Sequence, residues 1–196
     1  MFEIKTKIAV LVSGSGSNLQ AIIENIENRS LNCEISYVIA DRDCYAIERA
    51  KNYKIRTVVL ERKIFGKRLS EEINLLLKNT DEEISYIILA GYLSILSKEF
   101  IQDWNKKIIN IHPSLLPKYG GRGMYGLKVH KAVLENGEKK SGCTIHYVDS
   151  GIDTGKPIMK MEVPVLKNDT PETLQKRVLE KEHILLIEGI KKLISR

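Results

Sequence analysis

Short aliphatic runs alternate with segments of helical periodicity through the first half of the chain. Residues 7–13 predict a strand, and leucine and isoleucine recur at helical spacing from Asn18 onward. Because buried strands that alternate with helices form parallel sheets covered on both faces, we expect an α/β fold with ligands at the carboxyl ends of its strands. The same alternation predicts strands at 35–40, 57–60, 86–90 and 108–112, and helices near 46–53, 67–78 and 98–104.

Prolines and glycines interrupt this alternation after residue 112. Pro113, Pro117 and a series of glycines predict an irregular loop, and residues 149–156 predict a second one. Both loops directly follow strands, and irregular segments of this length inside a compact domain are typically functional. The remaining elements are a helix near 127–135, strands at 141–148 and 158–165, and a helix from about Pro171 with Thr170 as its N-cap.

Composition favours one globular domain over residues 1–196. The sequence is 43% hydrophobic and 29% charged, which is enough apolar material for a core. No apolar run reaches the roughly 18 residues of a membrane helix, and no secretion signal is recognisable. The three cysteines, Cys33, Cys44 and Cys143, lack C-x-x-C spacing, so we expect neither a disulfide framework nor a metal site. The expected location is the cytoplasm.

The net charge of +6 leaves the class of partner open. Basic residues are spread among acidic ones, and the densest basic cluster, 62–68, has only Phe65 as a nearby aromatic. Single-stranded nucleic acid binding depends on a series of stacking aromatics, so we expect no nucleic acid partner. An anionic small molecule remains compatible with this charge.

A glycine-rich segment, residues 13–18, lies between the first strand and the first helix. Its glycines allow close approach of a ligand, and a helix N-terminus favours phosphate. Leu19 stands where a dinucleotide fingerprint needs its third glycine, and no Gly-Lys-Ser/Thr follows for a Walker A loop. Phosphate binding and a simple turn with Ser17 or Asn18 as helix cap are both compatible with this segment.

The strand at 108–112 carries two polar side chains, Asn110 and His112. Period-two alternation places them on one face at the carboxyl end of the strand, about 6–7 Å apart. One interpretation ties both to neighbouring loops as structural groups. The other gives an amide that donates to a developing oxyanion beside an imidazole that moves a proton.

Three further positions have two interpretations each. In the loop 149–156, Asp149 and Asp153 either both hold the turn through Asx-type hydrogen bonds, or one of them, which the residues alone do not identify, faces His112. Glu182 falls on or beside the apolar stripe of the last helix, where it either reaches solvent or is buried with a partner. Cys143 alternates with apolar neighbours and is interpreted as core; a nucleophilic role would need an activating base.

Five segments carry a pattern known from one protein family: 13–22, 89–97, 110–117, 142–155 and 180–183. They resemble the folate-dependent formyltransferase family, and in particular its glycinamide ribonucleotide branch. The resemblance extends over about residues 7–194 and implies a single-domain, Rossmann-like, mostly parallel sheet with an antiparallel C-terminal strand. It also implies a phosphate-binding half of about 1–112 and a folate and catalytic-loop half of about 113–196.

The resemblance implies transfer of a formyl group from 10-formyltetrahydrofolate to the amine of glycinamide ribonucleotide in purine biosynthesis. Asn110 would bind the formyl oxygen, His112 would stabilise its charge, and Asp153 would pair with His112 and manage the amine proton. Glycinamide ribonucleotide would contact Gly16, Ser17 and Asn18 through its phosphate and Glu182 through its ribose. The folate would contact Arg68, Leu93, Ser94, Ile95, Leu96, Val148, Asp149 and Ile152.

Two positions depart from the family pattern, and two other functions stay open. Ser94 stands where many relatives carry Arg, and Lys156 separates Gly155 from Pro157. The alternatives are a nucleotide- or NAD-binding Rossmann protein, and a formyltransferase acting on another amine. Formyltransferases on methionyl-tRNA or sugar nucleotides are expected to be longer chains. A monomer and a homodimer are both compatible with the sequence.

Overall fold

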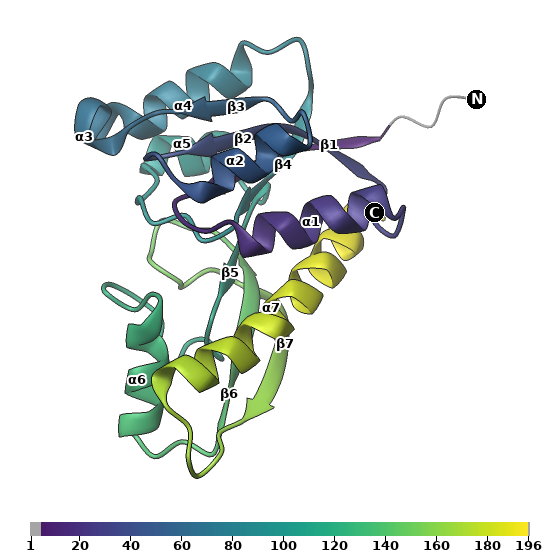
Figure 1. Ribbon diagram of the computed structural model, residues 1–196. Helices are drawn as coiled ribbons and strands as arrows, with labels where there is room; N and C mark the ends of the chain where they lie inside the picture. The colour runs from purple at the N-terminus through teal and green to yellow at the C-terminus, as the bar shows by residue number, and fades with distance from the viewer. Residues whose placement is uncertain (1–4, 196) are drawn as a thin grey trace. The chain divides into compact units, whose positions relative to one another are not determined.

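The computed structural model describes residues 5–195, and these fall into two compact units (Figure 1). The first unit comprises Met1–Ile109 with Lys191–Arg196, and the second comprises Asn110–Ile190. The boundary lies inside strand β5, Ile108–His112. The expectation of a single domain over 1–196 stays a prediction.

Parallel strands form the sheet of the first unit, in the order β3-β2-β1-β4. Residues 8–12 of β1 are fully buried, because this strand lies between β2 and β4 and is covered on both faces. The strand order reverses at β1, and such a switch point is where open α/β sheets bind ligands. The strands are β1 Thr6–Val12, β2 Cys33–Ala40, β3 Thr57–Val59 and β4 Ile84–Leu89.

Helices connect these strands in two groups. Helices α1 and α2 contact each other and β2, whereas α4 contacts α5 (Figure 1). Ser97 caps α5, because its Oγ accepts a hydrogen bond of 3.2 Å from the Phe100 N–H. The helical elements are α1 Ser17–Glu27, α2 Tyr45–Asn52, α3 Arg62–Phe65, the 3₁₀ helix η1 Gly66–Arg68, α4 Leu69–Lys78 and α5 Lys98–Asp103.

The second unit has the strand order β5-β6-β7, and β6 pairs antiparallel with β7. Its last helix begins at Pro171, and Thr170 caps it by accepting a hydrogen bond of 3.3 Å from the Thr173 N–H. This confirms the predicted start of the last helix. The elements are α6 Leu127–Glu135, β6 Lys140–Tyr147, β7 Pro157–Pro164 and α7 Pro171–Ile194. The second unit includes α7 only as far as Ile190.

The predicted helix near 67–78 is present as α4, with its start shifted by two residues. Two short elements, α3 and η1, precede α4, which begins only at Leu69. Gly66 has a φ of 55°, a left-handed conformation that a continuous helix does not contain. The other predicted elements are present, with ends shifted by one or two residues.

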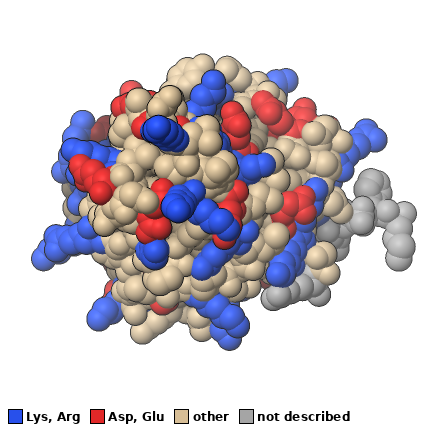
Figure 2. Space-filling model, turned by 90° about the horizontal axis from the view of Figure 1, so that it is seen from below, with Lys and Arg blue, Asp and Glu red and all other residues tan. Residues whose placement is uncertain are grey.

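The predicted fold class is confirmed. The strands of the first unit are parallel, helices flank them, and β7 is antiparallel to β6. Within residues 5–195, no helix is both long and apolar enough to cross a membrane. Basic and acidic side chains are interspersed over the face shown in Figure 2, as the sequence pattern indicates.

Candidate active site

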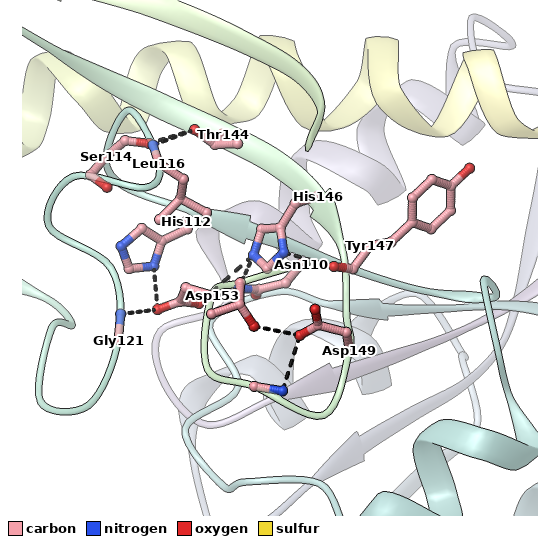
Figure 3. Close-up of polar contacts among 12 residues, drawn as sticks. Asn110, His112, Ser114, Leu116, Gly121, Thr144, His146, Tyr147, Asp149 and Asp153 are labelled. Atoms are coloured by element: carbon pink, nitrogen blue, oxygen red, sulfur yellow. Dashed lines mark hydrogen bonds and ion pairs between the residues drawn. The ribbon is translucent and has the colours of Figure 1, made fainter. Parts of the chain in front are cut away.

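Three polar side chains of the second unit converge at the end of β5 (Figure 3). Alternation along β5 places Asn110 and His112 on one face, and His112 is only 4% exposed. Asp153, from the loop between β6 and β7, faces both of them. Its Oδ2 lies 3.4 Å from Nδ1 of His112, and its Oδ1 lies 3.5 Å from Nδ2 of Asn110. The structure thus brings together the three residues predicted to be catalytic, whose role stays a prediction.

Asp153 is held in an uncommon backbone conformation. Its φ is 58°, in the left-handed region that non-glycine residues rarely adopt. The Gly121 N–H donates a hydrogen bond of 2.9 Å to Asp153 Oδ2, which joins the loop after β5 to the loop after β6. Gly120 lets these loops approach, because a Cβ there would lie 3.1 Å from Cβ of Asp153.

Asp149 has the structural role that one interpretation of this loop gives it. Its Oδ1 accepts hydrogen bonds of 3.0 Å from the Gly151 N–H and 2.6 Å from Oγ1 of Thr154. The loop therefore separates the functions of its two carboxylates: Asp149 holds the turn, and Asp153 faces His112.

Both ring nitrogens of His112 face acceptors. Nε2 lies 2.8 Å from the Tyr119 carbonyl oxygen, and Nδ1 faces the Asp153 carboxylate. Neither partner can donate, so the imidazolium form, with a proton on each nitrogen, satisfies both contacts. The arrangement can therefore hold a positive charge next to Asn110.

Two polar residues of this site, Thr144 and His146 on β6, were not predicted from the sequence. Thr144 is fully buried; its Oγ1 donates to the Ser114 carbonyl (2.7 Å) and accepts from the Leu116 N–H (3.1 Å), which fixes the segment after His112. His146 Nε2 lies 3.2 Å from Asn110 Nδ2. Thr144 and His146 share the face of β6 opposite Cys143, and that period-two pattern is the signal that could have found them.

A third histidine, His130 on α6, is buried near His112 without taking part in these hydrogen bonds. It is 1% exposed, and its Nδ1 has no hydrogen-bond partner within the described residues. Burial, followed by the charge of His112, lowers the pKa of His130 to about 4. The ring is therefore neutral at neutral pH.

The predicted phosphate-binding residues lie at the switch point of the first unit. Gly16 is the N-cap residue of α1, so neither Ser17 nor Asn18 caps the helix. Gly16 has a φ of 74°, and a Cβ there would lie 2.7 Å from Cβ of Ala46. Both facts require glycine, independently of any ligand.

The predicted folate-binding residues are divided between the units. In the first unit, Leu93 and Ile95 are exposed, whereas Ser94 and Leu96 are buried. Ser94 Oγ donates a hydrogen bond of 2.5 Å to the buried Asp41 carboxylate. The side chain of Arg68 is 68% exposed and pairs with Glu72 at 3.2 Å. In the second unit, Asp149 and Ile152 are exposed and Val148 is half-buried.

Glu182 and Cys143 are both buried in the second unit. Glu182 is 8% exposed, so the interpretation in which it reaches solvent is wrong. Cys143 is fully buried, and burial raises the pKa of its thiol to about 12, so it is interpreted as core. All three cysteines are free thiols. Between residues 5 and 195 there is no group of three or more His, Cys, Asp or Glu side chains that could hold a metal ion.

Comparison with protein families identifies the class to which this fold and site belong. The model of the formyl transferase family matches residues 6–190. The chain therefore belongs to the formyl transferase family.

Within this family, the chain is similar to proteins named phosphoribosylglycinamide formyltransferase. The chain is 42% identical over 191 residues to a protein of Arabidopsis thaliana named phosphoribosylglycinamide formyltransferase, chloroplastic. The match covers 95% of this chain and 64% of that relative, so the chain spans less than two thirds of its length.

Solved structures named phosphoribosylglycinamide formyltransferase share the fold. The structure from Anaplasma phagocytophilum is 38% identical with a TM-score of 0.86, and the one from Coxiella burnetii, in complex with CHES, is 36% identical with a TM-score of 0.89. Each match covers 98% of this chain and 88% of the other.

Proposed function

We propose that this chain transfers the formyl group of 10-formyltetrahydrofolate to the primary amine of glycinamide ribonucleotide, a step of purine biosynthesis. The observation that carries the proposal is the Asn110, His112 and Asp153 cluster, in a chain whose relatives are named for this substrate. The amine attacks the formyl carbon, the carbonyl electron pair moves to the oxygen, and a tetrahedral intermediate forms. Collapse of the intermediate expels tetrahydrofolate.

Asn110 and His112 would stabilise the oxygen as it gains negative charge. The Asn110 amide, which faces Oδ1 of Asp153, donates to the oxyanion. The imidazolium of His112, which faces Oδ2 of the same carboxylate, supplies positive charge. Hydrogen-bond donors fixed in place before reaction are worth about 10²- to 10³-fold in rate each. His112 can then pass a proton toward the departing nitrogen of the folate.

Asp153 would accept the proton that the amine loses on attack, directly or through a water molecule. The same carboxylate also contacts Nδ1 of His112, so both tasks involve one residue. The Gly121 N–H holds the Oδ2 atom of Asp153 in place for this role.

Binding of the two substrates is assigned to the predicted residues. The ribonucleotide phosphate would bind at Gly16, Ser17 and Asn18, because a helix N-terminus offers N–H donors and a favourable dipole. Glu182 would accept hydrogen bonds from the ribose hydroxyls. The folate ring would bind to backbone groups around residues 93–96 and 149, with Arg68 facing its glutamate tail.

The expected setting is the cytoplasm, with no resident metal and no nucleic acid partner. Support for a reducing compartment comes from the three free cysteines. The name of the relative from Arabidopsis thaliana includes the word chloroplastic, which describes the location of that relative and not of this chain.

The test follows formyl transfer by the absorbance change on conversion of 10-formyltetrahydrofolate. We expect the wild-type chain to use glycinamide ribonucleotide and Asn110→Ala and Asp153→Ala to lose at least about 10²-fold in kcat. A folded wild-type chain without this activity would sink the proposal. Formyl transfer to another amine only would indicate a different formyltransferase, and tight NAD binding without folate binding would indicate a Rossmann cofactor protein.

A further inference from the structure

His146 is a buried histidine that contacts Asn110 but has no part in the proposed chemistry. It lies on β6, is 2% exposed and points toward Asn110 (Figure 3). Its Nε2 lies 3.2 Å from Nδ2 of Asn110, and its Nδ1 lies 2.9 Å from the carbonyl oxygen of Tyr147. Each ring nitrogen therefore has one partner.

These partners fix the tautomer of His146. A carbonyl oxygen can only accept, so the Nδ1 atom that faces Tyr147 carries the proton. In the neutral ring, Nε2 then has a lone pair and can accept one N–H of the Asn110 amide. Burial lowers the pKa of His146, against the opposite effects of the Tyr147 carbonyl, Asp153 and Asp149, and the charge of His112 lowers it further. The neutral form is thus favoured.

Two acceptors select one orientation of the Asn110 amide. Nδ2 of Asn110 faces Nε2 of His146 at 3.2 Å and Oδ1 of Asp153 at 3.5 Å, and a flipped amide would present its oxygen to both. The contact to Asp153 is at the long limit of a hydrogen bond, whereas the contact to His146 is shorter. One amide N–H is therefore held by His146, and the second is available to a substrate oxygen.

We propose that His146 is a positioning residue: through its Nε2 lone pair, it holds the Asn110 amide so that the second N–H is directed at the formyl oxygen. The inference rests on the proposed function for its catalytic consequence. Protonation of Nε2 would place a donor opposite the Asn110 donor and leave Asp153 Oδ1, at 3.7 Å from Nε2, as its acceptor. The amide would then turn its oxygen toward His146.

The backbone around His146 supports this arrangement. The register of β6 and β7 shifts between Ile145 and His146, and such a bulge re-aims a side chain. Gly155 contributes as well, because a Cβ there would lie only 1.8 Å from the Tyr147 carbonyl oxygen that fixes the tautomer. The sheet register and the close approach of Gly155 thus both act on the backbone that carries His146 and its carbonyl partner.

A matched pair of variants tests the kinetic consequence. His146→Leu removes the acceptor, and His146→Gln keeps an oxygen acceptor near the position of Nε2. We expect kcat to fall about 10- to 100-fold in His146→Leu while KM for both substrates stays within about threefold, and His146→Gln to recover about tenfold of the loss. Wild-type kcat in His146→Leu would overturn the proposal.

Nitrogen NMR of the full chain tests the positioning itself. Long-range ¹H–¹⁵N spectra at neutral pH should show a protonated Nδ1 and an unprotonated Nε2 for His146, and a scalar coupling across the hydrogen bond should connect Asn110 Nδ2 with His146 Nε2. A proton on Nε2, or the absence of that coupling, would contradict the inference. An inactive wild-type chain would refute the proposed function, but these spectra would still show whether His146 holds the Asn110 amide. They also decide it if His146→Leu does not fold.

Discussion

Asp153 faces His112 across 3.4 Å, between Oδ2 and Nδ1, although His112 ends strand β5 and Asp153 lies in the loop between β6 and β7. The same Oδ2 atom accepts the Gly121 N–H at 2.9 Å, so a single oxygen meets both the imidazole and the backbone of the other loop. The charge of Asp153, rather than its shape alone, is therefore what His112 requires.

Asp153→Asn should retain the fold and lose activity. The amide keeps the shape of the side chain, but it removes the negative charge that faces His112 and the base that accepts the amine proton. We expect kcat to fall by about 10²- to 10⁴-fold. The absorbance assay measures kcat, and circular dichroism melting checks the fold.

The matched control is Glu162→Gln on β7. The Glu162 side chain is 57% exposed and pairs with Lys140 at 2.7 Å, so this substitution removes a carboxylate from the same unit without touching the site. Wild-type kcat is expected for the control. Equal kcat values in both variants would refute a catalytic role of Asp153.

Gly155→Ala should destabilise the second unit. A Cβ at this position would lie 1.8 Å from the Tyr147 carbonyl oxygen, so the loop has to move away from β6. Overpacking of this kind costs about 1–3 kcal/mol of the free energy of unfolding. Urea unfolding measures it. Gly14→Ala, where a Cβ meets nothing within 4 Å, is the control and should change the free energy by less than about 0.5 kcal/mol. Identical unfolding curves for the two variants would contradict the steric explanation.

Burial of His130 should make stability depend on pH. The pKa of His130 is lowered in the fold to about 4, so between its ordinary value near 6.5 and about 4 the unfolded chain binds the proton and the folded chain does not. The contribution of the neutral His130 ring to the free energy of unfolding is therefore fully present above the pKa of the unfolded chain, and it is lost as the pH falls through this window.

His130→Leu removes the titrating group. The loss of unfolding free energy between neutral pH and the lower end of the window should be smaller in this variant than in wild type, by about 2–3 kcal/mol. Urea unfolding at the two pH values gives the difference, from which the carboxylates common to both proteins cancel. The same pH dependence in both proteins would show that the fold does not lower the pKa of His130.

Asp169→Asn should weaken the start of α7 without changing the chemistry. The Asp169 side chain is 3% exposed and accepts hydrogen bonds of 2.6 and 2.8 Å from the Arg177 guanidinium, which holds the pKa of Asp169 well below its usual range. Because that pKa is depressed, the stabilisation is present above the ordinary carboxyl pKa and disappears as the pH falls below it.

We expect a loss of about 2–4 kcal/mol in the free energy of unfolding at neutral pH, with kcat unchanged. Thermal and urea unfolding measure the loss, and Glu162→Gln, which breaks an exposed pair, should cost less than about 1 kcal/mol. A loss in Asp169→Asn no larger than in that control would show that the pair does not anchor the helix.

The sequence pattern predicted the positions of the strands and helices along the chain well and the conformations of the loops poorly. Asn110 and His112 could be placed on one face because strand periodicity is local. The choice between Asp149 and Asp153 could not be made from residues alone, since it depends on how the chain turns after β6. The resemblance to known formyltransferases made that choice, and the structure places Asp153 opposite His112.

His146 shows a different limit. Its face of β6 was visible in the alternation with Cys143 and Ile145, but its importance comes from a contact with Asn110 on another strand. The helix α3 was missed because four residues give no periodicity. The burial of Glu182 depends on tertiary packing around α7, which a helical stripe only outlines.

The left-handed backbone of Asp153 has a consequence for how this position can evolve. At a φ of 58° an aspartate costs about 1 kcal/mol of conformational energy that glycine does not. Drift toward glycine would relax the backbone and delete the carboxylate in one step. Selection for a stable fold alone would not preserve Asp153 against that drift, so under the proposed mechanism turnover is the pressure that keeps an acid at this turn.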